Sequence, residues 1–299
     1  MKRRIIFISI LFYVFSMLSG ALFAETQRFQ ELLEAANSGD AVAQSLVGFC
    51  YNYGKGVKQS YTEAVKWYRK SAEQGDANAQ FSLALMYQDG KGVSQSNTEA
   101  VKWFRESAEQ GDADAQYGLA LMYQDGKGVT QNYTEAVKWY RKSAEQGDAD
   151  AQYSLAFMYQ DGKGVKQSNT EAVKWFRKSA EQGNADAQYS LAYIYYYGKG
   201  VEQNRREAAR WFHKSAEQGN AKAQSSLGVM YNLGDGVIQN YEDAYFWFTL
   251  ATTIGLSESD LSKTLLELRN ETEKQFLFQP GKVESIKARA QKWLDDKGL

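Results

Sequence analysis

Residues 76–111 read DANAQFSLALMYQDGKGVSQSNTEAVKWFRESAEQG, and this stretch decides the fold because the chain repeats it. Tryptophan returns at an interval of 36 residues, and two glycine series keep the same interval. The three series are Trp67, Trp103, Trp139, Trp175, Trp211 and Trp247; Gly39, Gly75, Gly111, Gly147, Gly183, Gly219 and Gly255; and Gly54, Gly90, Gly126, Gly162, Gly198 and Gly234. Because all three series keep this interval throughout, they define six units over residues 39–254. Such a repeat predicts a solenoid, in which neighbouring units pack on one another.

Each unit is predicted to form a hairpin of two helices. In the quoted stretch, Asp76 can cap a first helix that runs to about Asp89, and Gly90 lies just past its end. Ser96 and Glu99 have the spacing of a capping box at the start of a second helix. Each helix carries one apolar stripe: Ala79, Leu83, Ala84 and Tyr87 on the first, and Ala100, Trp103, Phe104 and Ala108 on the second. In a single hairpin these apolar stripes would be exposed to solvent, so the units must stack to bury them.

Composition narrows the classes of function. The 299 residues are 43% hydrophobic and 24% charged with a net charge of −1, which excludes a disordered chain and gives no support for nucleic-acid binding through phosphates. The single Cys50 excludes an internal disulfide and a multi-cysteine zinc site, and its position inside an apolar helix favours a buried role over a reactive thiol. The single His213 aligns with arginines of the other units and is interpreted as a solvated residue. We therefore expect no cofactor and no metal site.

Residues 1–24 have the pattern of a secretory signal peptide. Lys2, Arg3 and Arg4 form a basic start, an apolar run follows, and cleavage after Ala24 or Ala21 fits equally well. The alternative is an uncleaved anchor, because residues 5–24 are just long enough to span a bilayer. In both cases we expect the rest of the chain to be exported, to the periplasm or beyond the cell. A membrane contact follows only if the segment is retained.

Two segments outside the repeats are predicted to cap the array. Residues 25–38 form an amphipathic helix with Phe29, Leu32, Leu33 and Ala36 on one side. In the last unit, Phe246, Leu250 and Ile254 stand where the second unit has Lys102, Glu106 and Gln110, so a normally solvated face becomes apolar. Residues 255–299 contain two helical apolar patterns, and we expect two tail helices to cover that face. The patterns are Leu261, Leu265 and Leu268, then Val283, Ile286, Ala290 and Trp293.

The recurring residues resemble a known family. The pattern Ala-x-x-x-Leu-Ala-x-x-Tyr-x-x-Gly-x-Gly-Val followed by Glu-Ala-x-x-Trp-Phe-x-x-Ser-Ala-x-x-Gly, as in Ala79 to Gly111, is similar to the Sel-one-like repeat (SLR) family, a relative of the tetratricopeptide repeat. The resemblance implies an all-α, right-handed superhelical solenoid of antiparallel helix pairs and a role as a binding scaffold, often in exported proteins. One cysteine-rich branch binds penicillin through repeats with paired cysteines, and a chain with only Cys50 does not carry that activity over.

Candidate partner-binding residues vary between units while the frame stays constant. By the resemblance, the first helix of each unit lines the concave groove, and the variable first-helix positions carry aromatic residues, which anchor interfaces well. These positions are Phe81, Tyr117, Tyr153 and Tyr189, with Phe157, Tyr193, Tyr196 and Tyr197. For the column from Phe81 to Tyr189, packing between hairpins is the alternative to exposure in the groove. Tyr193 to Tyr197, with three arginines after them, make unit five the predicted hot spot.

Acidic residues suggest the chemistry of the partner. Asp89, Asp125 and Asp161 stand at the C-terminal ends of first helices, where a carboxylate is unfavourable by a few tenths to about 1 kcal/mol. Either the nearby Lys91, Lys127 and Lys163 offset them, or the acids face a basic ligand. We expect a protein or peptide partner that bears Lys or Arg.

No set of residues forms a catalytic constellation, so we expect a binding protein rather than an enzyme. The Gly-Lys-Gly-Val loop lacks the spacing of a phosphate-binding loop, and Glu63 and its equivalents are capping residues. Three alternatives share the same frame: a cell-wall-directed hydrolase, a carbohydrate-binding module and a host-directed effector.

Overall fold

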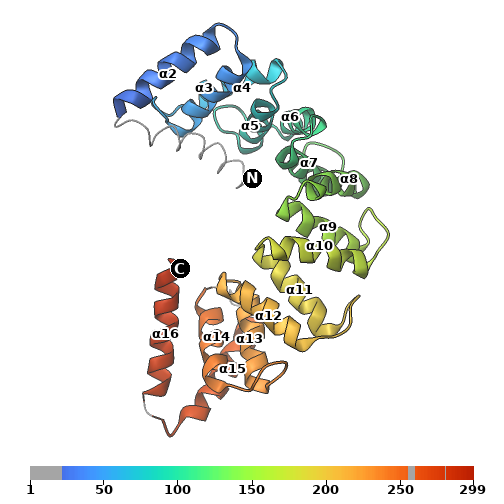
Figure 1. The fold of residues 1–299 in the computed structure, drawn as a ribbon, viewed down its shortest axis with the longest axis vertical. Coiled ribbons are helices and arrows are strands. Elements are labelled where there is room, and N and C mark those ends of the chain that lie inside the picture. Colours follow the sequence, from blue (N-terminus) through green and yellow to red (C-terminus); the bar gives the residue numbers. More distant parts are fainter. Residues whose placement is uncertain (1–21, 255–259, 280) are drawn as a thin grey trace. The chain divides into compact units, whose positions relative to one another are not determined.

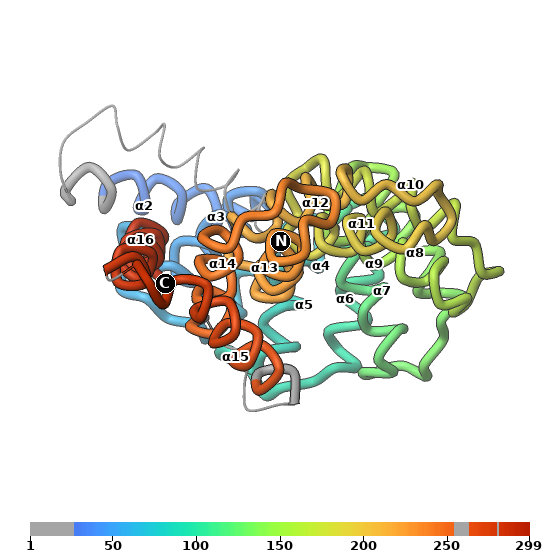
Figure 2. Tube along the Cα trace, turned by 90° about the horizontal axis from the view of Figure 1, so that it is seen from below, coloured from blue at the N-terminus to red at the C-terminus, as the bar shows by residue number. Residues whose placement is uncertain are grey.

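The computed structural model describes residues 22–254, 260–279 and 281–299, and all regular structure in these ranges is helical. The predicted all-α repeat architecture is confirmed: each unit is a helical hairpin, and the hairpins follow one another in tandem (Figures 1 and 2). Most of the segment predicted as a signal peptide lies outside the described residues.

The six hairpins have nearly constant lengths. The first helices are α3 (Ala41–Tyr53), α5 (Ala77–Asp89), α7 (Ala113–Asp125), α9 (Ala149–Asp161), α11 (Ala185–Tyr197) and α13 (Ala221–Leu233). The second helices are α4 (Tyr61–Glu73), α6 (Asn97–Glu109), α8 (Tyr133–Glu145), α10 (Asn169–Glu181), α12 (Arg205–Glu217) and α14 (Tyr241–Ile254). The elements outside the hairpins are α2 (Leu22–Asn37), α15 (Asp260–Glu273), the 3-10 turn η1 (Lys274–Phe276) and α16 (Lys282–Lys297).

The chain divides into two compact units, and the division falls within α9. One unit consists of Met1–Ala151 and Lys163–Val165, and the other of Gln152–Gly162 and Lys166–Leu299. The same positions form the core in both. In the second repeat, Leu83, Ala84 and Phe104 are completely buried, and Trp103 is buried at 8% exposure.

The helix caps form as predicted, with one difference. The Asp76 side chain accepts the backbone N–H of Ala79 at 2.7 Å, and Gly90 ends α5 in the left-handed conformation. At the second helix, Ser96 Oγ accepts the N–H of Glu99, which is half of a capping box. The other half is not made, because the N–H of Ser96 donates to the carbonyl of Tyr87 at 2.9 Å. That bond closes the loop between the two helices of the hairpin.

Asp148, the cap of α9, predicts a pH dependence of stability. Its carboxylate accepts the N–H of Ala151 at 2.7 Å, but burial raises the pKa of Asp148 above its ordinary 3.8. Ionised Asp148 therefore costs stability above its raised pKa, and this cost is absent below the ordinary value. Asp148→Asn keeps a capping oxygen, as Asn184 does in α11. We expect its unfolding free energy in urea to equal or exceed wild type at pH 7, with any gain vanishing near pH 3; lower stability at pH 7 would contradict this.

Each repeat touches the one before it through a loop glycine. A Cβ on Gly92, Gly128 or Gly164 would overlap the backbone of Tyr61, Asn97 or Tyr133, respectively, at the start of the preceding repeat's second helix. Gly128 also has a φ of +70°, a conformation that side chains disfavour. The second glycine of the Gly-Lys-Gly loop is therefore needed for a contact between repeats.

The N-terminal end of the repeats is covered by α2. Phe29 and Ala36 are buried together with Val47 and Cys50 of α3, and the ring of Phe29 lies 5.5 Å from that of Tyr51 in an edge-on contact. Leu32 and Leu33 pack at the margin of the same cluster. The structure thus places the amphipathic segment of residues 25–38 against the first repeat.

The C-terminal helices α15 and α16 both pack on α14 (Figures 1 and 2). Phe246 and Leu250 are buried, whereas Lys102 and Glu106 at the same positions of the second repeat are exposed. Leu265 of α15 joins Ala244 and Phe248 in one apolar cluster. The predicted contact of Ile254 lies outside the residues whose side chains are described.

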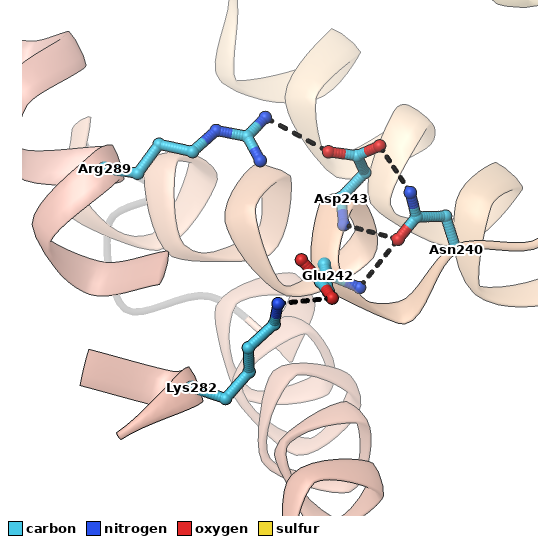
Figure 3. Close-up of polar contacts among 5 residues, drawn as sticks. All are labelled: Asn240, Glu242, Asp243, Lys282 and Arg289. Atoms are coloured by element: carbon cyan, nitrogen blue, oxygen red, sulfur yellow. Dashed lines mark hydrogen bonds and ion pairs between the residues drawn. The ribbon is translucent and has the colours of Figure 1, made fainter. Parts of the chain in front are cut away.

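Polar contacts fix α16 against the start of α14 (Figure 3). Lys282 Nζ lies 2.6 Å from Glu242 Oε1, and Arg289 Nη2 lies 3.1 Å from Asp243 Oδ1. Asn240 caps α14 by accepting the N–H groups of Glu242 and Asp243, and its amide donates to Asp243 at 2.7 Å. The acids that complement the helix dipole therefore also hold the tail.

Candidate partner-binding site

The first predicted aromatic column lies at the edge of the core. Phe81 is only 6% exposed, with its ring 6.0 Å from that of Phe104, so the prediction that Phe81 lines an open groove is corrected: a partner cannot reach most of this ring. The sequence left packing between neighbouring hairpins as the alternative, whereas the ring of Phe81 meets Phe104 of α6 within its own hairpin.

The tyrosines of the same column are half-buried. Tyr117 lies 5.8 Å from Tyr140, Tyr153 lies 5.8 Å from Phe176, and Tyr189 lies 5.7 Å from Phe212, measured between ring centroids. Phe157, also half-buried, contacts Tyr153 and Phe176 edge-on at 4.9 and 5.0 Å. Burial raises the pKa of Tyr189. Each of these rings is therefore partly covered by the second helix of its own hairpin, and only part of it is left for a partner.

Tyr193 and Tyr197 of α11 are the exposed members of the predicted set. Their side chains are 37% and 55% exposed, and their ring centroids lie 4.5 Å apart. Lys199 Nζ lies 4.8 Å from the Tyr193 ring and 5.7 Å from the Tyr197 ring, within the range of a cation–π contact. We call Tyr193, Tyr196, Tyr197 and Lys199 the tyrosine cluster.

Tyr196 is held in place by a residue that the sequence reasoning missed. Its hydroxyl donates to Asp235 Oδ2 at 2.7 Å, and Arg205 Nη1 lies 2.7 Å from the other carboxylate oxygen. The Arg205 guanidinium also stacks 5.2 Å from the Tyr196 ring centroid. The hydrogen bond to Asp235, more than burial, raises the pKa of Tyr196. Asp235 stands where other repeats have a loop lysine, and that charge reversal was the available signal.

Two of the acids of the predicted site form ion pairs with neighbouring lysines. Asp89 Oδ2 lies 2.8 Å from Lys91 Nζ, and Asp125 Oδ2 lies 2.8 Å from Lys127 Nζ. Asp161 is exposed at the end of α9. The lysine explanation therefore holds for Asp89 and Asp125, and a continuous acidic groove does not follow from their sequence positions.

A pocket of about 480 Å³ lies between α3 and α5, beside the start of α4. Aromatic rings make up much of its wall, and its rim includes the Asp89–Lys91 pair. The lining residues are Phe49, Asn52, Tyr53, Gln59, Tyr61, Tyr68, Asn78, Phe81, Ser82, Leu85, Met86, Gln88, Asp89 and Lys91. The sequence reasoning missed Phe49, Tyr53 and Tyr61, although Tyr53 stands in the same column as Asp89 and Tyr197.

The cysteine and the histidine, which each occur once in the chain, both pack against other side chains. Cys50 is buried at 1% exposure, as predicted. His213 is half-buried: its ring meets Trp247 edge-on at 5.4 Å, and Nδ1 lies 3.4 Å from Glu217. Within the described ranges no group of His, Cys, Asp and Glu residues is arranged to hold a metal ion. None of the helices in those ranges is both long and apolar enough to cross a membrane.

Comparison with known families accounts for this repeated geometry. The family model of the Sel1 repeat matches residues 41–76, 77–112, 113–148, 149–184, 185–220 and 221–255. The chain belongs to the Sel1 repeat family. The resemblance stated on the residue pattern from Ala79 to Gly111 is thereby confirmed, and each matched Sel1 repeat begins with the first helix of a hairpin. Sel1 repeat proteins are typically scaffolds for protein–protein interaction.

Two solved structures resemble this Sel1 repeat protein over most of its length. A protective antigen of uropathogenic Escherichia coli strains, which displays an SLR fold, is 34% identical with a TM-score of 0.79; the match covers 90% of this chain but only 56% of the antigen. A Sel1 repeat protein from Oxalobacter formigenes is 36% identical with a TM-score of 0.68, over 79% of this chain and 93% of that one. Neither is described as an enzyme. None of the curated proteins matches this chain.

Proposed function

We propose that this Sel1 repeat protein is an exported, non-enzymatic scaffold that binds a protein or peptide segment on the surface of its first helices. The observation that carries the proposal is the tyrosine cluster of α11. The repeated tryptophans of the second helices are buried, whereas Tyr193 and Tyr197 stay exposed side by side. Tyrosine buries a large area at low entropic cost, so exposed pairs of this kind are suited to interfaces.

The geometry supports a preformed contact surface. Lys199 lies near both rings, and Tyr196 is fixed by Asp235 and Arg205. Side chains that are already ordered lose little conformational freedom when a partner binds. The tyrosine cluster thus resembles an interface hot spot in composition and in order.

Replacing Tyr193 and Tyr197 together by alanine should weaken partner binding by more than about 1 kcal/mol, or more than about fivefold in Kd. Both side chains are substantially exposed, so the thermal midpoint should change little. Binding is measured by titrating the purified partner, and stability by circular dichroism. A loss of binding that follows a loss of fold would not support the surface, and unchanged affinity would contradict it.

Site-specific crosslinking tests the scaffold proposal and finds the partner. A photoreactive phenylalanine placed at Tyr197 should form an adduct with a protein in the native cells, and one placed at exposed Lys138 of α8 should not. Both positions are at the surface, so the comparison controls for random collision. Equal labelling from the two positions, or none from either, would count against the first-helix surface.

The chemistry of the partner and the export route remain proposals with separate tests. We propose a partner that bears Lys or Arg, because the Asp89–Lys91 ion pair on the first-helix surface is open to solvent and a cation of the partner can replace the lysine. Its affinity should fall as salt is added. Residues 1–24 should be absent from the mature protein, which N-terminal sequencing of the exported chain can show; a retained segment would identify an anchor instead.

A further inference from the structure

The pocket between α3 and α5 combines an aromatic pair with an exposed ion pair. The aromatic pair recurs in α11 as Tyr193 and Tyr197, but Leu233 and Asp235 stand there at the positions of Asp89 and Lys91. In α3, Phe49 and Tyr53 replace the leucine and aspartate that α5 and α7 carry at these positions. Their rings lie 4.6 Å apart, and Tyr53 is 44% exposed. Tyr61, 38% exposed, contributes a ring from the start of α4. The pocket is thus lined by several aromatic rings and is open to solvent.

The deeper part of the wall is rigid. Gly48 lets the ring of Tyr68 pack closely on α3, because a Cβ there would lie 2.7 Å from a ring carbon. Tyr68 is buried, and burial raises the pKa of Tyr68 and keeps it a neutral phenol, although its hydrogen bond with the Ser82 side chain acts in the opposite direction. The floor is therefore an uncharged aromatic surface with hydroxyl groups.

The charges of the pocket are a single pair at its rim. Asp89 is the one acid and Lys91 the one base among its lining residues. The pair is open to water, with side-chain exposures of 46% for Asp89 and 53% for Lys91. An exposed ion pair contributes little stability, so another cation can replace the lysine on Asp89 at small cost. A cationic group of a ligand can therefore bind Asp89 at the position that the Lys91 ammonium group occupies.

We propose that this pocket binds an arginine side chain of the partner, whose guanidinium stacks on the tyrosine rings and takes the place of Lys91 on Asp89. The proposal rests on the scaffold function and names the side chain that the scaffold selects. Arginine fits better than lysine because its planar guanidinium can stack on a ring and form two parallel hydrogen bonds to one carboxylate. A pocket of about 480 Å³ also lies within the usual range for ligand sites.

The third repeat supplies a matched control. Asp125 and Lys127 form the same 2.8 Å ion pair, two residues apart, as Asp89 and Lys91. At the junction between α5 and α7, however, Leu85 and Asp89 stand in place of Phe49 and Tyr53, and Asn97 stands in place of Tyr61. A ligand that needs only the carboxylate should bind at both pairs, whereas one that needs rings and carboxylate should bind at Asp89 alone.

The experiment is a calorimetric titration of the full chain with capped Gly-Arg-Gly. The same peptide with citrulline, which has the arginine shape without the charge, should bind at least tenfold more weakly. Asp89→Asn should weaken arginine binding at least fivefold, and Lys91→Ala should strengthen it by removing the competitor. Asp125→Asn and Lys127→Ala should leave it unchanged. Tyr53→Ala should also weaken binding, with an unchanged thermal midpoint as evidence that the fold is intact.

Two results would overturn the proposal. Equal binding of the arginine and citrulline peptides, or of Asp89→Asn and wild type, removes the charge recognition. Equal effects of Asp89→Asn and Asp125→Asn remove the role of the rings. The scaffold function is tested separately: crosslinking from Tyr197 with no arginine binding leaves the scaffold and rejects the pocket. Arginine binding without any protein adduct would support the pocket and count against the scaffold function.

Discussion

Deleting residues 256–299 should sharply destabilise the sixth repeat and make the protein aggregate. The deletion removes Glu273, whose carboxylate accepts the Tyr245 hydroxyl at 2.9 Å, and Arg289, whose guanidinium lies 4.0 Å from the Phe246 ring centroid. It also removes α15 and α16, which pack on α14, and Phe246 and Leu250 of α14 are at most 3% exposed in the full chain. Each large apolar side chain that becomes fully exposed costs about 1.5–3 kcal/mol. We therefore expect the unfolding free energy to fall by at least about 3 kcal/mol.

The cause of the loss can be separated from the loss of chain length. In the truncated protein, Phe246→Lys, Leu250→Glu and Ile254→Gln restore the residues that the second repeat carries at these positions. This variant should recover solubility, because its face is again polar. Urea unfolding and light scattering measure the two effects. A truncated chain that is as soluble and stable as the full one would show that the tail is not a cap.

Gly128→Ala should be the most damaging alanine substitution among the glycines of its repeat loop. The new Cβ would overlap the Asn97 backbone, which cannot move without shifting the start of α6. The left-handed conformation of residue 128 adds about 1–3 kcal/mol of strain for a residue with a side chain. The steric overlap adds about 1–3 kcal/mol more, as overpacking typically does.

Gly111→Ala is the control for Gly128→Ala. Gly111 also has a positive φ, of 98°, but among the described residues no atom lies within 4 Å of the position its Cβ would take. The φ of Gly111 lies further outside the left-handed region open to side chains than the 70° of Gly128, so alanine at residue 111 has at least as much conformational strain. A larger loss of unfolding free energy in Gly128→Ala than in Gly111→Ala therefore comes from the contact between repeats. Equal losses would mean that the loop does not determine how neighbouring repeats pack.

The repeat architecture was predictable because every local signal recurs. The capping residues, the loop glycines and the buried tryptophans each occur in several copies. An atypical residue in one repeat therefore does not change the predicted structure of that repeat. The second half of the capping box was not predictable in this way. The Ser96 N–H has two possible acceptors at similar reach, and only the path of the loop decides that it bonds to Tyr87.

The candidate site was less predictable, because exposure depends on the side chain across the hairpin. The interval places Phe81 and Tyr189 in one column, but the rings of α6 and α12 decide how much of each remains exposed. The pocket at Asp89 needs three helices to be placed before its rings meet. Asp235 shows the opposite case, since a reversed charge in an otherwise constant loop marks a contact with Arg205 that the sequence alone could have suggested.

The glycine contact between consecutive repeats also bears on how such chains evolve. Its two partners always come from adjacent copies in the same register, so a crossover between gene segments that adds or removes one 36-residue copy leaves every junction with a matching pair. An insertion of another length between the two contact positions would change their separation along the chain and disturb that register. The number of repeats between the arginine pocket and the tyrosine cluster can therefore change by one repeat at a time. Recombination can thus change how many residues separate the two sites along the chain without altering the residues of either.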